Sequence, residues 1–95
     1  MFAVTVTFTL KPGLRGTFLP LMVKNAALTL HDEPGCHQFD VCLGQDPDMV
    51  FLYEIYDDSA AFDAHLESMH FKSFDTAVAG MIAAKVVHQY VEVIR

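Results

Sequence analysis

The first stretch of the chain alternates between apolar and polar or small residues. From Phe2 to Leu10, Phe, Val and Leu occupy one set of alternate positions, and Ala and Thr occupy the other. A period of two with many β-branched residues predicts a strand. A helix is expected next, beginning at Gly16 or Thr17 as N-cap, with Pro20 in its first turn, where its missing N–H matters least. Pro34, followed by Gly, predicts the end of this helix.

Two further apolar runs predict a β-hairpin. The segments 37–44 (HQFDVCLG) and 49–56 (MVFLYEIY) flank Gln45-Asp46-Pro47-Asp48, a cluster that favours a turn and cannot continue a strand. Strands joined this closely are antiparallel neighbours. The second run is apolar at most positions on both of its faces, so we expect both faces to be covered.

The rest of the chain returns to helical spacing and then to alternation. Ser59 is a natural N-cap for a helix, a second helical segment is expected at about Phe71 to Ala83, and Lys85 to Ile94 alternates like a strand. The order β-α-β-β-α-β predicts one α+β domain over residues 1–95. We expect a ferredoxin-like sandwich, with a four-stranded antiparallel sheet and helices on one face. The bare face of the sheet predicts a homodimer, with two sheets packed face to face into a dimeric α/β barrel.

Composition supports this expectation and excludes some partners. The 95 residues are 53% hydrophobic, a surplus that favours an oligomer interface or a ligand cavity. A net charge of −6 argues against nucleic acid as a partner. No segment approaches the roughly 18–20 apolar residues needed to cross a membrane. The first ten residues alternate like a strand and lack the features of a signal peptide.

The two cysteines bear on the compartment. Cys36 and Cys42 are six residues apart on one predicted strand, so their Cα atoms would be roughly 20 Å apart and cannot be bridged by a disulfide. Unpaired thiols fit a reducing cytoplasm. We expect both cysteines to be buried small apolar residues.

The sequence gives little support for a metal or a cofactor. His65 and His70 are five residues apart, which is poor spacing for joint ligation on one helix. There is no paired CxxC, no HExxH and no glycine-rich phosphate loop. GxSxG is absent as well, so covalent catalysis has little support. We therefore predict a site without metal or cofactor.

A small polar set directed at an apolar interior remains. His65 shares a helical stripe with Phe62, Leu66 and Met69, and Asn25 lies on the inward stripe of the first helix. A lone histidine on an apolar face is often a satisfied core residue, and a core amide bonded to backbone is an equal alternative for Asn25. The functional interpretation is a neutral imidazole acting as general base, with the amide orienting a ligand.

Other residues could complete such a cavity. Glu54 is a third candidate for a catalytic role, and His70 lies at the break between the helical segments. Phe39, Phe71 and Phe74 would supply flat walls, although each is also an ordinary core candidate. None of the lysines can be assigned to the cavity from the sequence.

Several motifs in series resemble a known family. They are EPGC-xx-FDV, LYE-x-Y, AF-x-AH and HF-x-x-F, within NAALTLHDEPGCHQFDV, QDPDMVFLYEIYDDSAAFDAH and SMHFKSF. Together they resemble the antibiotic biosynthesis monooxygenase family, and in particular its quinol monooxygenase branch, over about Phe2 to Ile94. The resemblance implies the ferredoxin-like fold and the homodimer. The absence of Trp weighs against the related haem-degrading branch.

The resemblance also implies a reaction, the oxygenation of a quinol or phenolic aromatic substrate by O₂ without metal or flavin. On the matching positions, Asn25 and His65 are the polar cavity residues and Glu54 belongs to the LYE motif; His65 as base is inferred from its stripe. A base, orientation and water exclusion are what such a reaction needs from a protein. Two alternatives stay open: an isomerase of a small keto compound, and a non-catalytic module that binds an aromatic metabolite.

Overall fold

Strands and helices follow one another in the predicted order. A computed structural model describes all residues, Met1–Arg95. The elements are β1 Phe2–Leu10, α1 Arg15–Asp32, β2 Cys36–Leu43, β3 Met49–Tyr56, α2 Ser59–Glu67, α3 Met69–Val78, the 3₁₀ turn η1 Ala79–Met81, and β4 Ile82–Tyr90.

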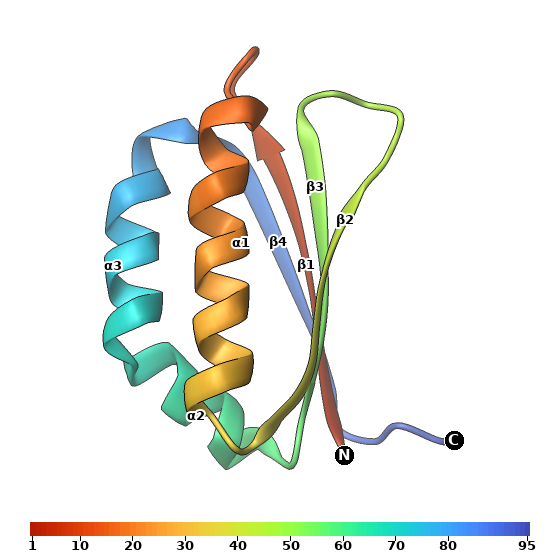
Figure 1. Ribbon diagram of the computed structural model, residues 1–95. Coiled ribbons are helices and arrows are strands. Elements are labelled where there is room, and N and C mark those ends of the chain that lie inside the picture. Colours follow the sequence, from red (N-terminus) through yellow and green to blue (C-terminus); the bar gives the residue numbers. More distant parts are fainter.

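The strands form one antiparallel sheet in the order β2-β3-β1-β4. Helices α1 and α3 lie side by side against one face of this sheet, with α2 crossing at the end where both termini lie (Figure 1). The prediction of a ferredoxin-like α+β fold is therefore confirmed. The opposite face of the sheet carries no helix (Figure 1).

The register of the strands decides which side chains face the helices. Val4 of β1 lies opposite Glu54 of β3, which in turn lies opposite Phe39 of β2. All three are buried under the helices. Residues of the other parity, such as Phe51 and Val86, lie on the bare face and are exposed.

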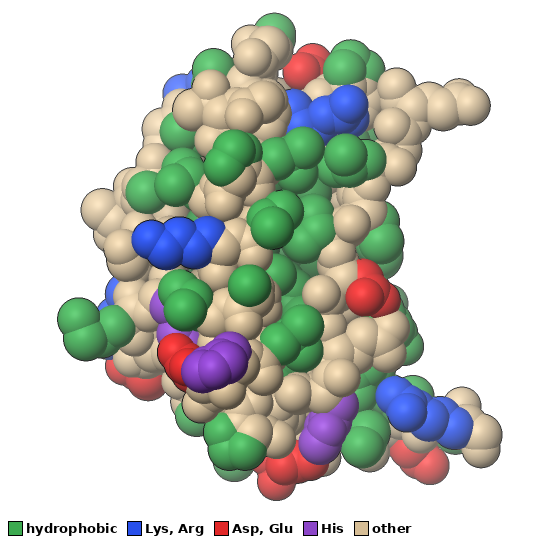
Figure 2. Space-filling view, in the orientation of Figure 1, with side chains coloured by type: hydrophobic (Ala, Val, Ile, Leu, Met, Phe, Trp, Pro, Cys, Tyr) green, Lys and Arg blue, Asp and Glu red, His purple; other side chains and the backbone are tan.

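Aromatic packing joins the helices to the sheet. The Phe18 ring of α1 meets Phe8 of β1 edge to face at 5.2 Å between centroids, and Phe74 of α3 at 5.8 Å. Large apolar side chains of this kind dominate the hydrophobic stabilisation of a small core. Figure 2 shows hydrophobic side chains gathered along the middle of one face, with histidine and acidic side chains concentrated toward the lower end.

The boundaries of α1, α3 and β4 differ from the predictions, and α3 covers Met69–Val78 instead of about Phe71 to Ala83. Helix α1 begins at Arg15, its N-cap Leu14 makes no side-chain capping bond, and Pro20 therefore lies beyond the first turn. Strand β4 covers Ile82–Tyr90 instead of Lys85 to Ile94. Helix α3 ends at Val78, and only the 3₁₀ turn η1 separates it from the strand, so the strand begins three residues earlier than predicted. The first turn of α1 is thus held without the predicted cap.

The cysteines are both free, and one departs from expectation. Cys36 is buried, but Cys42 is exposed because it lies on the bare face of edge strand β2, opposite Phe51.

No helix is both long and apolar enough to cross a membrane.

Candidate functional site

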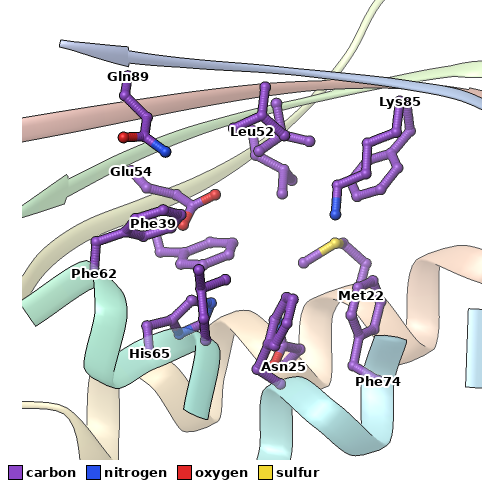
Figure 3. Close-up of a pocket in the computed structure, with 15 residues that line it drawn as sticks. Met22, Asn25, Phe39, Leu52, Glu54, Phe62, His65, Phe74, Lys85 and Gln89 are labelled. Atoms are coloured by element: carbon purple, nitrogen blue, oxygen red, sulfur yellow. The ribbon is translucent and has the colours of Figure 1, made fainter. Parts of the chain in front are cut away.

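A hollow of about 320 Å³ lies between the helices and the sheet. Ten of its 15 lining residues are hydrophobic, so it is an apolar space with a few polar groups projecting into it. Figure 3 shows side chains reaching it from the helices on one side and from the strands on the other. The polar or charged lining residues are Asn25, Glu54, His65, Lys85 and Gln89.

His65 reaches the hollow from helix α2. This helix begins after Asp58, whose carboxylate accepts a hydrogen bond from the Ala61 N–H at 2.8 Å. His65 is only 2% exposed. Its ring stacks on Phe62, one turn earlier, at 6.2 Å between centroids, and lies 5.1 Å from Phe71. Packing on both sides fixes the direction of the imidazole.

A break in the helix brings a second histidine to the first. Ser68 is extended between α2 and α3, and its hydroxyl donates to the His65 carbonyl at 2.7 Å and accepts from the Phe71 N–H at 3.2 Å. The change of direction lets His65 and His70 both reach the carboxylate of Glu33, just past the C-terminus of α1. Oε2 of Glu33 lies 2.8 Å from His65 Nδ1 and 2.5 Å from His70 Nε2.

These contacts set the protonation of His65. A carboxylate can only accept hydrogen bonds, so His65 Nδ1 carries a proton and, in the neutral ring, Nε2 keeps its lone pair. Burial lowers the pKa of His65, and the hydrogen bond and charge of Glu33 only partly offset this effect. At neutral pH the ring is therefore uncharged and able to accept a proton.

Glu54 enters the hollow from strand β3. It is 3% exposed, and its Oε1 accepts a hydrogen bond from the Tyr56 hydroxyl at 2.6 Å. Burial raises the pKa of Glu54 to about 7, against the smaller opposing effects of the Tyr56 hydrogen bond and the Lys85 charge. This carboxyl therefore changes its charge near neutral pH.

Asn25 is the polar residue that α1 contributes. It is 3% exposed, and its Oδ1 is buried with no hydrogen-bond partner. Its backbone carbonyl is satisfied by the helix and by the Thr29 hydroxyl at 2.7 Å, so only the side-chain amide is left over. An unpaired buried amide oxygen is costly, which favours the ligand-orienting interpretation over the core amide.

The predicted walls line the same hollow. Phe39 of β2, Phe71 and Phe74 of α3 are all among its lining residues. His70 is not: it borders a separate, smaller depression between α1 and α3. The structure therefore brings His65, Asn25, Glu54 and the three phenylalanines to one space. His70 lies outside this space and contacts the same Glu33 oxygen as His65.

Sequence reasoning missed three residues. Glu33 was only a helix-ending residue in the sequence, and nothing local indicates that it contacts His65, 32 positions later. Lys85 and Gln89 come from β4, where they and Val87 share the helix-facing parity. The alternation of β4 contained this signal, but the sequence could not decide which parity faces the helices.

The spacing argument against a metal does not hold for this pair of histidines. It assumed one continuous helix, whereas the break at Ser68 places ligand atoms of Glu33, His65 and His70 within 4.8 Å of one another. Imidazole and carboxylate are donor types that transition metals accept. Here the carboxylate is already satisfied by two imidazole hydrogen bonds.

Comparison with known proteins agrees with the fold. A protein from Nitrosomonas europaea, provisionally named an antibiotic biosynthesis monooxygenase, superposes with a TM-score of 0.92 at 25% identity, covering 99% of this chain and 100% of its own. Another antibiotic biosynthesis monooxygenase gives a TM-score of 0.89 at 26% identity, with 99% and 100% coverage. A protein from Mycobacterium tuberculosis, at 23% identity, TM-score 0.89 and coverage of 99% and 96%, shows the shared fold.

The sequence comparisons give the family. No curated protein matches the chain. The family profile described as "Antibiotic biosynthesis monooxygenase" matches residues 1–77, which run from β1 to the last turn of α3 and include most of the residues around the hollow. With this match over most of its length, and the fold seen in its structural relatives, the chain belongs to the antibiotic biosynthesis monooxygenase family.

Proposed function

We propose that this protein oxygenates a quinol or phenolic aromatic compound with O₂, without a metal or flavin, and that His65 is the general base. The observation that carries the proposal is the buried, neutral imidazole of His65, whose Nδ1–H is held by Glu33 while the ring lines an apolar hollow. Family membership supports the reaction class.

The proposed reaction begins with proton transfer. Nε2 of His65 takes the phenolic proton, and the resulting anion is electron-rich enough to give an electron to O₂. The two radicals combine to form a C–O bond, and the peroxide takes up a proton. The O–O bond then breaks with loss of the hydrogen on the same carbon, leaving a carbonyl there and one molecule of water. For a hydroquinone, quinol plus O₂ thus becomes hydroxyquinone plus water.

The lining of the hollow suits these steps. An apolar site makes hydrogen bonds and charges act more strongly than in water and protects a reactive anion from side reactions. The Asn25 amide, which lacks a partner for Oδ1, is available to hold the substrate hydroxyl. The rings of Phe39, Phe71 and Phe74 offer faces and edges to an aromatic substrate.

The test is oxygen consumption by metal-stripped protein over a panel of hydroquinones and naphthoquinols. We expect His65→Ala to lower the rate by about 10²–10⁴-fold. His31→Ala is the matched control, since His31 is exposed and pairs only with its neighbour Asp32. A panel in which no quinol reacts faster with the protein than without it contradicts the proposal.

A second candidate is an isomerase of a small keto compound. Glu54, with a pKa of about 7, gives the hollow a second group that can exchange protons near neutral pH, beside His65. A base and an acid in one apolar site are what proton transfer between two carbons requires. Turnover under strict exclusion of oxygen would favour this candidate, and binding of an aromatic ligand without turnover would favour a non-catalytic module.

We also propose that the protein is a homodimer whose sheets pack through the bare face. A row of residues across this face, Val86, Thr7 and Phe51, carries two exposed apolar side chains, 48% exposed for Val86 and 39% for Phe51. Sedimentation analysis should show a dimer that Phe51→Glu dissociates. Val23→Glu, at an exposed valine on helix α1, is the matched control and should leave the dimer intact.

A further inference from the structure

Lys85 brings an ammonium group to the hollow. It lies on β4 opposite Phe8, on the side of the sheet that faces the helices. The residues that β4 contributes to the hollow, Lys85, Val87 and Gln89, are all exposed, so the hollow is open to solvent beside this strand. Figure 3 shows the side chain of Lys85 reaching from the strand into the space, toward Met22 and across from His65. Its Nζ lies 5.6 Å from the centroid of the Phe8 ring and 5.9 Å from that of Phe71.

This ammonium group forms no ion pair. The single ion pair made by a lysine or arginine in the chain joins Lys72 to Glu67. The one carboxyl group that shares the hollow with Lys85 is Glu54, which forms no ion pair and is hydrogen-bonded to Tyr56 instead. The attraction between a cation and the face of an aromatic ring is weak compared with the attraction between a cation and an anion in the same apolar setting. Lys85 is exposed beside the opening of the hollow, so its charge is free to meet an anionic group of a ligand that enters there.

At the other side of the hollow the free groups are of a different kind. The Asn25 amide has an oxygen without a partner, and His65 presents a neutral imidazole whose Nδ1 is already used by Glu33. These groups match a hydroxyl, which both donates and accepts a hydrogen bond. The two sides of the hollow therefore suit two different substituents of a ligand, an anionic group at Lys85 and a hydroxyl at Asn25 and His65.

We infer that the occupant is a hydroxylated aromatic carboxylic acid, with its carboxylate at Lys85 and its hydroxyl at His65 and Asn25. The hydroxyl end rests on the proposed function, whereas the carboxylate end rests on Lys85 alone. One lysine with no arginine beside it in the lining suits a singly charged carboxylate better than a phosphate, which proteins usually meet with several donors.

The experiment compares two fluorescent probes of the same ring system under argon at neutral pH. The anionic probe is 6-hydroxy-2-naphthoate, and the neutral probe is 2-naphthol, which lacks the carboxylate. For the unmodified protein we expect the naphthoate to bind at least about tenfold more tightly, the usual contribution of one charged hydrogen bond. Equal or weaker binding of the naphthoate overturns the inference.

Two variants locate the effect. Lys85→Met should lose this preference by weakening naphthoate binding about tenfold while leaving 2-naphthol binding unchanged. Lys11→Met removes the same charge from another exposed lysine, one that lines no part of the hollow, and it should keep the preference. An equal loss in both variants, or an equal loss for both probes in Lys85→Met, contradicts a carboxylate subsite at Lys85.

Binding without oxygen keeps this test separate from the proposed reaction. If the naphthoate preference is present and depends on Lys85 but no substrate is oxygenated, the proposed function fails and the subsite stands. If quinols are oxygenated and Lys85→Met leaves both probes unaffected, the reverse holds. Retained binding of 2-naphthol by Lys85→Met serves as the check that this variant is folded.

Discussion

Two glutamates lie at the candidate site, and their surroundings differ. Oε2 of Glu33 accepts hydrogen bonds from two imidazoles, at 2.8 Å from His65 and 2.5 Å from His70. Glu54 accepts one hydrogen bond, from the Tyr56 hydroxyl at 2.6 Å, and forms no ion pair. The partners of Glu33 can become cations, whereas the partner of Glu54 cannot.

The difference shows that the hydrogen-bond partners of a glutamate determine which function its carboxyl group can have. A carboxylate between two histidines has its charge compensated whenever either ring is protonated, so Glu33 is suited to orient His65 and to stabilise its charged form. Glu54 has no hydrogen-bonded cation, the charge of Lys85 offsets the effect of burial only in part, and burial raises its pKa to about 7. Glu33 is therefore a positioning residue, and Glu54 is a group that changes charge in the neutral range.

The largest expected effect tests Glu54 through stability. Its pKa is about 7 in the folded protein and 4.5 in the absence of the fold, so between these values the folded state holds the extra proton. The corresponding stability is fully present below pH 4.5 and is lost as pH rises to about 7, by about 3 kcal/mol in all. In Glu54→Gln this loss should disappear, while the Tyr56 hydroxyl keeps an acceptor.

Urea unfolding of both proteins from pH 5 to 8 measures this effect. The lowered pKa of His65 acts in the opposite sense, since its contribution is lost as pH falls below the ordinary histidine range. Subtracting the curve of Glu54→Gln from that of the unmodified protein removes the part due to His65. Parallel curves would show that Glu54 is not the group that titrates.

The next effect tests whether Glu33 orients the base. Glu33→Gln leaves a hydrogen-bond acceptor but removes the charge, and we expect the oxygenation rate to fall roughly 10–100-fold. Because Glu33 raises the pKa of His65, the acid limb of the pH–rate profile should also move to lower pH. A purely structural role would lower the rate without moving this limb.

His70→Gln is the companion measurement for Glu33. It removes one donor to the same carboxylate but leaves the His65 contact in place. We expect a smaller loss of rate than in Glu33→Gln. A larger loss would place His70, and not Glu33, at the centre of the cluster.

The smallest expected effect is a change in the pKa of the Cys36 thiol, which depends on the charges of both glutamates. The pKa of Cys36 is raised to about 11, mainly by burial and to a smaller extent by the charges of Glu54 and Glu33, Glu54 more than Glu33. In a Cys42→Ser background, the pH midpoint of alkylation should therefore fall more in Glu54→Gln than in Glu33→Gln. Equal midpoints in all three proteins would mean that neither charge reaches the thiol.

Local patterns were enough to predict the elements and part of the site. Alternation identified β1 with its observed bounds, and the turn cluster at residues 45–48 identified the hairpin. Helical spacing placed His65 with Phe62, and Asn25 on the inward stripe of α1, because side chains one turn apart share a face. Boundaries that depend on how one element meets the next, such as the start of β4, were missed.

The sequence by itself determined the order of the elements, and through it the fold and the inward direction of His65 and Asn25, since these follow from periodicity over short distances. Only the tertiary structure decided which face of the sheet meets the helices. That choice buried Glu54 and turned Lys85 toward the hollow. It also joined Glu33 to two histidines more than 30 positions away. Contacts of this kind depend on strand register and on the turn of the chain at Ser68, which no local pattern specifies.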